Sequence, residues 1–152
     1  MTTIVEQLLQ HKGRHVHTVE PGATIGYAVA LMGEKEIGAV LVCQTQRVVG
    51  VLSERDCMRG VLWKKECSPE SAVRDLMRTD FVTVRPQDSI EHCMSLMVDR
   101  RTRHLPVIDD ERLVGIISMG DVINGLLRDQ QHLIDTLESY ISGSPSVRPQ
   151  AH

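Results

Sequence analysis

The sequence predicts an α/β protein built from two copies of one supersecondary unit that pack on each other. Residues 16–58 return at residues 81–123, at a constant offset of 65 residues and without a gap, with 12 identities in 43 positions. In each copy, a stretch with helical periodicity is followed by two β-rich runs and a second helical stretch. In the β-rich runs, most differences between the copies exchange one apolar residue for another, as a shared core requires.

Each copy is predicted to contain the same elements in the same order. The first copy is expected to have a leading helix at 4–11, an extended segment at 16–19, an amphipathic helix starting at Ile25, strands at 39–43 and 48–52, and a final helix at 54–62. The second copy is expected to have the same elements at 71–78, at 81–84, from Ile90, at 105–108 and 113–117, and from 119 onward. Polar turns join the paired strands. Each extended segment ends at a proline, which cannot donate to a strand ladder.

Two differences between the copies precede the amphipathic helices. The leading helices align at an offset of 68, so three residues around Lys12, Gly13 and Arg14 are extra in the first copy. Asp88 with Glu91 predicts a capping box in the second copy. The first copy has Ala23 at the corresponding position, which predicts a less sharply defined helix start.

The repeat defines the organisation of the chain. We expect a first repeat at residues 4–62, a linker at 63–70, a second repeat at 71–125, a helical extension at 126–143 and a disordered tail at 144–152. Along the extension Leu127, Gln130, Ile134, Leu137 and Ile141 form a short heptad-like stripe. This stripe fits two alternatives, a helix that folds back onto its own module or a contact between two copies of the chain.

Composition and cysteine spacing exclude several classes of function. A net charge of −3 argues against a nucleic-acid partner, which would require a basic face. Apolar runs such as 39–43 are too short to span a membrane, and no signal-peptide pattern is present, so a cytoplasmic protein is expected. The four cysteines lack the close pairing of a zinc site, so no metal site is predicted. Three are expected to be reduced core thiols, and Cys67 is the candidate for an exposed one.

Two polar identities stand at the end of a strand in each copy. Ser53 with Asp56 returns as Ser118 with Asp121, each pair directly after a strand ending and at the start of a helix. A hydroxyl can hydrogen-bond to phosphate, and a carboxylate suits the two hydroxyls of a ribose, so the pattern indicates duplicated ligand sites. The alternative is a plain capping box, in which the side chains only close the start of the helix.

Arginines near these positions favour an anionic ligand. Arg100, Arg101 and Arg103 precede His104, while Arg55 and Arg59 follow Ser53. The guanidinium fork fits phosphate oxygens, although cations at 100–103 would also suit the C-terminal end of a helix. The matching residues of the first copy are Lys35, Glu36, Ile37 and Gly38. We therefore expect weaker phosphate surroundings in the first copy and unequal sites.

The combined motifs resemble a stand-alone pair of cystathionine-β-synthase (CBS) domains, a Bateman module. The resemblance covers about residues 4–125 and rests on Thr18-Val19-x-Pro21, Ile37-Gly38-Ala39-Val40-Leu41-Val42, Gly50-Val51-Leu52-Ser53-Glu54-Arg55-Asp56, Arg103-His104-Leu105-Pro106-Val107 and Gly115-Ile116-Ile117-Ser118-x-x-Asp121. It implies two β-α-β-β-α repeats packed through their sheets, with two clefts related by a pseudo-twofold axis.

The resemblance also implies which residues meet a ligand. Such modules bind AMP, ADP, ATP, NAD(H) or S-adenosylmethionine. By position, the ribose hydroxyls would be held by Asp56 and Asp121. Phosphate would be approached by Ser53 and Ser118 and contacted by Arg55, Arg101 and Arg103. The adenine would be framed by Thr18, Thr83, Gly38, Ala39, His104, Leu105 and Pro106. Because only the second repeat has the His-x-Pro element and the adjacent arginines, it is expected to be the better nucleotide site.

No nucleophile–base pair or set of metal ligands emerges from the sequence, so no enzymatic activity is predicted. The first hypothesis is a regulatory module that senses adenine nucleotides and passes the signal to an unidentified effector protein. The alternative is a ligand-free interaction protein that works through its dimer surfaces. A homodimer is expected in both cases.

Overall fold

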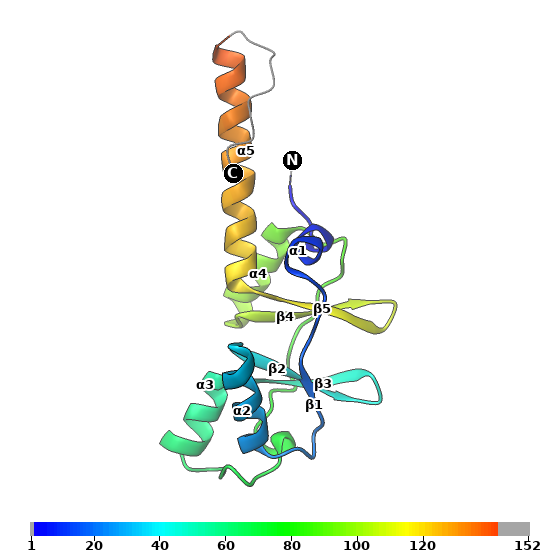
Figure 1. Ribbon diagram of the computed structural model, residues 1–152, viewed down its shortest axis with the longest axis vertical. Coiled ribbons are helices and arrows are strands. Elements are labelled where there is room, and N and C mark those ends of the chain that lie inside the picture. Colours follow the sequence, from blue (N-terminus) through cyan, green and yellow to red (C-terminus); the bar gives the residue numbers. More distant parts are fainter. Residues whose placement is uncertain (1, 143–152) are drawn as a thin grey trace.

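Two small sheets lie one above the other, with helices on their outer sides and one long helix leaving the body of the molecule (Figure 1). The structure is a computed structural model and describes residues 2–142. Its elements are α1 (Val5–Lys12), β1 (Thr18–Val19), α2 (Ile25–Lys35), β2 (Ala39–Gln44), β3 (Arg47–Ser53), α3 (Glu54–Cys57) continued by a π-helical turn (Met58–Trp63), a 3₁₀ turn (Val73–Asp75), α4 (Ile90–Arg100), β4 (His104–Asp109), β5 (Arg112–Ser118) and α5 (Met119–Ile141).

The two repeats have the same strand arrangement. In the first, β1 runs parallel to β2 and β2 pairs antiparallel with β3. In the second, β4 pairs antiparallel with β5, and a single parallel bridge from Val84 to Val107 stands where β1 stands in the first repeat. The predicted strand at 81–84 is therefore reduced to one bridge. Both ladders shift register after the fourth pair, at Val42/Cys43 and Val107/Ile108.

The sheets face each other across an apolar cluster. Ala39, Leu41 and Val51 of the first repeat are buried there, with Leu113 and Ile116 of the second repeat packed against them. This cluster confirms the prediction that the repeats pack through their sheets. Each repeat also has its own core on the helical side of its sheet.

The leading segments are exchanged between the repeats. Val5, Leu8 and Leu9 of α1 are buried in the core of the second repeat, whereas Val73 is buried in the core of the first, with Met77 packed against it. Figure 1 accordingly shows α1 beside β5 and α5. The chain therefore crosses twice between the two halves of the module, a feature that the order of the repeats does not reveal.

Several local predictions need correction. The helix expected at 71–78 is only the 3₁₀ turn of Val73–Asp75. The amphipathic helices are capped alike: Thr24 and Ser89 accept hydrogen bonds from the backbone N–H groups of Tyr27 and His92, both at 3.1 Å. The capping residue thus stands one position later than predicted in both copies. Asp88 instead accepts from the N–H of Arg85, at 2.8 Å, and closes the preceding turn.

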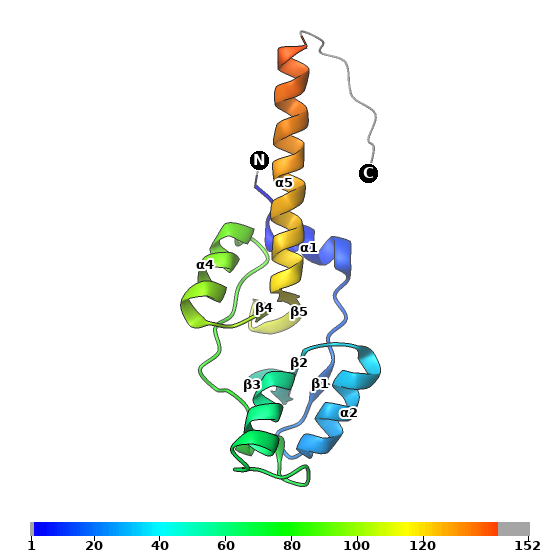
Figure 2. The same ribbon diagram turned by 90° about the vertical axis from the view of Figure 1, so that its left-hand side faces the viewer.

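The long helix α5 leaves the module rather than folding back onto it (Figures 1 and 2). Leu127, Ile134, Leu137 and Ile141 of the predicted stripe are all exposed, Leu137 to 51% and Ile141 to 86%. The fold-back alternative is therefore wrong. The tail at 144–152 and the end of the extension at 143 lie outside the described residues.

The cysteines divide into two classes. Cys57 and Cys93 are buried, while Cys43 and Cys67 are half-buried. Cys43 was predicted to be a core thiol and Cys67 to be the exposed one, but both are half-buried. No helix within residues 2–142 combines the length and apolarity that a membrane span requires.

Candidate functional site

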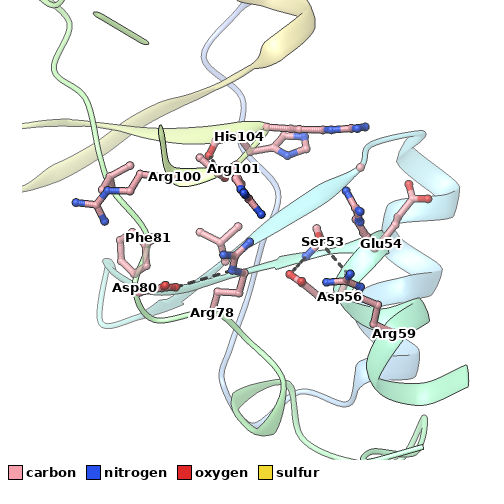
Figure 3. Close-up of a pocket in the computed structure, with 16 residues that line it drawn as sticks. Ser53, Glu54, Asp56, Arg59, Arg78, Asp80, Phe81, Arg100, Arg101 and His104 are labelled. Carbon is pink, nitrogen blue, oxygen red and sulfur yellow. Dashed lines mark hydrogen bonds and ion pairs between the residues drawn. The ribbon is translucent and has the colours of Figure 1, made fainter. Parts of the chain in front are cut away.

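A pocket of about 520 Å³ lies between the two repeats. One wall comes from the end of β3 and from α3, with Ser53, Asp56 and Arg59 (Figure 3). The opposite wall comes from the end of α4 and the start of β4, with Arg101 and His104. The remaining lining residues are Gly38, Val51, Glu54, Arg55, Arg78, Asp80, Phe81, Val82, Arg100, Thr102 and Arg103. The pocket therefore depends on the packing of one repeat against the other.

Ser53 and Asp56 form a capping box at the start of α3. Ser53 Oγ accepts from the N–H of Asp56 at 3.1 Å, and Asp56 Oδ2 accepts from the N–H of Ser53 at 3.3 Å. The capping interpretation is thus confirmed, but it does not exhaust the carboxylate, which has two oxygens and about four acceptor positions. Within residues 2–142, no basic side chain forms an ion pair with Asp56. The carboxylate keeps acceptor capacity for a ligand.

The backbone at the end of α4 brings arginines to the pocket. Arg101 has a left-handed conformation, with φ 52° and ψ 43°, and ends the helix. The chain reverses there, so that both Arg101 and Arg103 line the pocket. Glu36 ends α2 in the same way in the first repeat, with φ 55°. The scaffold is thus duplicated here while the side-chain charge is inverted.

The pocket has a surplus of positive charge. Its lining contains six arginines (Arg55, Arg59, Arg78, Arg100, Arg101 and Arg103) against three acidic residues (Glu54, Asp56 and Asp80). Asp80 partly offsets Arg78, with 3.8 Å between Oδ1 and Nε. Arginine forks bind phosphate and carboxylate oxygens through paired hydrogen bonds. The lining therefore favours an anionic ligand with more than one negative group.

The structure corrects the predicted grouping of these residues. Arg101, Arg103 and His104 were assigned to the same site as Ser118 and Asp121, but they line the pocket of Ser53 and Asp56. The reason is the sheet packing, which sets the end of α4 in one repeat against the strand–helix junction of the other. Chain neighbourhood and spatial neighbourhood differ at this point.

The second polar pair has the same local geometry in different surroundings. Asp121 Oδ2 accepts from the N–H of Ser118 at 2.8 Å, and Ser118 Oγ accepts from the N–H of Asp121 at 3.2 Å. Lys12 Nζ lies 2.6 Å from the same Asp121 oxygen. Burial alone would raise the pKa of Asp121, but the hydrogen bonds from Lys12 and Ser118 outweigh it and lower that pKa.

His104 lies between the pocket and the Lys12–Asp121 pair. A methyl group added at Gly38 would stand 3.5 Å from His104 Cε1. The pKa of His104 is lowered, first by burial and then by the charges of Lys12 and Arg103, with Asp121 acting in the opposite sense. The protein therefore favours the neutral form of the His104 imidazole.

The other predicted residues are not placed by their side chains in this pocket. Thr18 and Thr83 are exposed and do not line it, while Ala39, Leu105 and Pro106 are buried. Only the backbone of the buried residues could meet a ligand. The sequence did not point to Arg78, Asp80 and Phe81, which come from the leading part of the second repeat. Phe81, the single phenylalanine of the chain, was a possible signal.

Within residues 2–142, no cluster of His, Cys, Asp and Glu is suited to hold a metal ion.

Comparisons with known proteins agree with this architecture. The model of the CBS domain matches twice, at residues 6–62 and 73–128. The CBS domain-containing protein YhcV of Bacillus subtilis (strain 168) is 33% identical over 108 residues, which are 70% of this chain and 76% of YhcV. The mitochondrial CBS domain-containing protein CBSX3 of Arabidopsis thaliana is 32% identical over 125 residues, which are 79% of this chain but only 61% of the plant protein.

Solved structures show the same fold. The CBS-domain containing protein ATU1752 from Agrobacterium tumefaciens is 36% identical with a TM-score of 0.77, over 82% of this chain and 94% of that chain. The CBS domain pair of MJ0100, in complex with 5′-methylthioadenosine and S-adenosyl-L-methionine, has a TM-score of 0.74 at 20% identity, over 86% of this chain and 99% of that chain. The cytosolic domain of the Mg²⁺ channel MgtE, in complex with ATP, has a TM-score of 0.61 at 28% identity, over 74% of this chain and 45% of that chain.

Proposed function

Because this chain belongs to the CBS domain family, with both domains matched, we propose that it is a non-catalytic regulatory module that binds an adenine nucleotide in the pocket between its repeats. The nucleotide is AMP, ADP, ATP or NAD(H), and its presence is passed to an effector protein as a change in module geometry. The observation that carries the proposal is the meeting of the Asp56 carboxylate with six arginines around one pocket.

Each part of a nucleotide has a chemical counterpart in this pocket. Asp56 retains acceptor capacity for ribose hydroxyls, and Ser53 supplies a hydroxyl beside it. Arg101 and Arg103 on the opposite wall suit phosphate oxygens. Phe81 offers an apolar ring to the base. Thr18, Thr83 and the backbone of Ala39, Leu105 and Pro106 remain proposed contacts at the edge of the site.

The relatives support an adenosine compound, and the charge of the pocket narrows the choice. MJ0100 was solved with 5′-methylthioadenosine and S-adenosyl-L-methionine, and the MgtE domain with ATP. S-adenosylmethionine has a sulfonium cation and no phosphate. An arginine-rich lining repels that cation and attracts phosphate. We therefore place the phosphorylated nucleotides before S-adenosylmethionine as ligands of this chain.

A thermal-shift screen with AMP, ADP, ATP, NAD⁺, NADH and S-adenosylmethionine tests the proposal. A ligand that binds only the folded chain raises the melting temperature, and we expect larger shifts from the phosphorylated compounds. Arg101→Ala should reduce the shift, while Arg112→Ala, an exposed arginine in the second hairpin, should leave it unchanged. No shift from any compound at about millimolar concentration, a large excess over any useful Kd, would sink the proposal.

The exposed stripe on α5 supports the second candidate function, an interaction protein that works through a dimer surface. Leu127, Ile134 and Leu137 are exposed on a helix that leaves the module. In soluble proteins, exposed apolar patches of this kind mark interaction surfaces. A CBS-CP12 protein with a CBS-type structure at 27% identity was solved as a hexamer. We propose a homodimer through α5, acting in the cytoplasm, without nucleic acid or membrane as partner.

A further inference from the structure

Lys12 contacts, in the second repeat, residues equivalent to two that line the pocket in the first. Its ammonium group donates to Asp121 Oδ2 at 2.6 Å and to the carbonyl oxygen of Ile116 at 3.0 Å. Asp121 and Ile116 correspond, at the offset of 65, to Asp56 and Val51. Both Asp56 and Val51 line the pocket between the repeats. Asp121 and Ile116 thus stand at positions equivalent to the pocket lining of the first repeat, but an ammonium group contacts both of them.

The three extra residues of the first copy explain why only one cleft is affected. Lys12, Gly13 and Arg14 have no counterparts before the second repeat. Gly13 ends α1 with φ 102°, a conformation that glycine adopts without strain. Arg14 then returns to α1 and forms two hydrogen bonds with Glu6, one of them 3.0 Å from Nη1 to Oε1. These contacts hold the segment beside the cleft floor, where Lys12 meets Asp121.

The contact places a competing cation on the carboxylate that a nucleoside would need. Asp121 already accepts from the N–H of Ser118 with the oxygen that Lys12 contacts. An ammonium group only donates, so it competes directly with ribose hydroxyls for this carboxylate. The pKa of Asp121 is lowered by these hydrogen bonds despite burial, which keeps the carboxylate ionised and the pair intact at neutral pH.

We infer that Lys12 is an internal occupant of the second cleft and the residue that limits each chain to a single nucleotide site. The inference rests on the proposed function, because it assumes that a nucleotide suits the duplicated cleft chemistry. The three-residue insertion thereby acquires a role in specificity. The insertion converts a symmetric pair of clefts into one open site and one closed site.

Equilibrium dialysis of the full chain with labelled ATP tests this role. We expect one ATP per chain for the unaltered protein and two for Lys12→Ala. Lys12→Gln, which removes the charge and keeps a slightly shorter polar side chain, should also gain a site, whereas Lys12→Arg should remain at one. Lys64→Ala, an exposed lysine after the π-helical turn, is the matched control and should bind one ATP. The added site should weaken at least about tenfold when Asp121→Asn is combined with Lys12→Ala, a difference of about 1.4 kcal/mol.

The outcomes separate this inference from the proposed function. If the unaltered chain binds neither ATP nor any other nucleotide of the thermal-shift screen, but Lys12→Ala gains one Asp121-dependent ATP site, the proposed function fails and the role of Lys12 stands. If the unaltered chain binds two ATP molecules, or if neither Lys12→Ala nor Lys12→Gln gains a site while remaining folded by circular dichroism, the role of Lys12 is refuted.

Discussion

Leu9 of α1 packs directly on Gly115 of β5, at the point where the leading segment of the first repeat enters the core of the second. A methyl group added at Gly115 would lie 2.7 Å from Leu9 Cδ2, and Leu9 itself is fully buried. The equivalent contact joins Gly50 with Met77, where the added methyl would also approach the carbonyl oxygen of Arg78 at 3.1 Å. These two glycines therefore make room for the exchanged segments.

Gly115→Ala should destabilise the protein, because the added methyl would force the fully buried Leu9 side chain to shift within the core. We expect a loss of about 1–3 kcal/mol, the usual cost of overpacking a core. Gly33→Ala in α2 is the matched control, since no atom of the described part of the chain outside the local helix backbone lies within 4 Å of the added methyl there. It should stabilise by up to about 1 kcal/mol through helix propensity. Urea denaturation measures both, and equal stability of the two variants would contradict the close contact.

Asp56→Ala should reduce the nucleotide-induced thermal shift more than Asp121→Ala. Asp56 lines the open pocket and has no basic ion-pair partner among residues 2–142, whereas Asp121 is paired with Lys12. This order reverses the one expected from the sequence. Losing a hydrogen bond to a charged group costs about 1.5–3 kcal/mol, so the affinity should fall about tenfold to a hundredfold in Asp56→Ala. Each shift is measured against the same variant without ligand, because both substitutions also remove half of a capping box. A larger loss in Asp121→Ala would restore the original order.

The lowered pKa of His104 predicts a loss of stability on acidification. In the unfolded chain this imidazole titrates near 6.5, and in the folded chain it titrates lower. As the pH falls through the unfolded pKa, the unfolded state binds more protons than the folded state, so the free energy of unfolding decreases. The contribution is fully present above the unfolded pKa and diminishes towards the folded one, with a slope of at most about 1.4 kcal/mol per pH unit for one proton.

His104→Gln removes this titration and should flatten the stability profile between about pH 7.5 and pH 5.5. Denaturant melts at intervals across that range measure the slope. His17, whose pKa is also lowered, first by burial and then by the charges of His15 and Lys35, contributes the same background to both proteins. Identical slopes in the two proteins would show that His104 is not the group responsible.

The thiols should react with a disulfide reagent in two classes. Burial, followed by the charges of Asp56 and Glu54, raises the pKa of Cys57 to about 11, and burial followed by Asp88 raises that of Cys93 to about 12. Both should stay unmodified in the native protein near neutral pH, because the thiolate is the reactive form. The half-buried Cys43 and Cys67 should react first, and Cys67→Ser should remove one of the rapid events. Rapid modification of all four thiols without denaturant is the contrary result.

Leu137→Glu should weaken the proposed dimer without unfolding the chain. The side chain is 51% exposed on α5, so the monomer loses little on substitution. Sedimentation analysis should show a shift from dimer to monomer, because a charge in an apolar contact is costly to bury. Gln87→Glu, an exposed loop position, makes the same charge change and should leave the assembly intact. A monomeric unaltered chain would contradict the role of α5.

Local features of the fold were accessible from the sequence, because they depend on neighbouring residues. The amphipathic periodicity from Ile25 and Ile90 predicted α2 and α4, and the capping boxes at Ser53 and Ser118 were among the alternatives considered. The hairpin turns were located correctly, although their φ values of 54° and 66° at Thr45 and Gln46 had no glycine to signal them. The helix expected at 71–78 is limited to Val73–Asp75, and Arg78 forms an antiparallel bridge with Val51 of β3, a long-range pairing that the local pattern does not reveal.

By itself, the sequence determined the duplicated scaffold: its elements, the Ser-x-x-Asp pairs, the family resemblance and the asymmetry of the copies. Only the tertiary structure decided which wall faces which cleft. Arg101 lies opposite Asp56 because the sheets of different repeats pack together, and Lys12 reaches Asp121 because α1 crosses into the second core. Periodicity and capping act over a few residues, whereas these contacts join residues that are brought together only by burying apolar surface between the repeats.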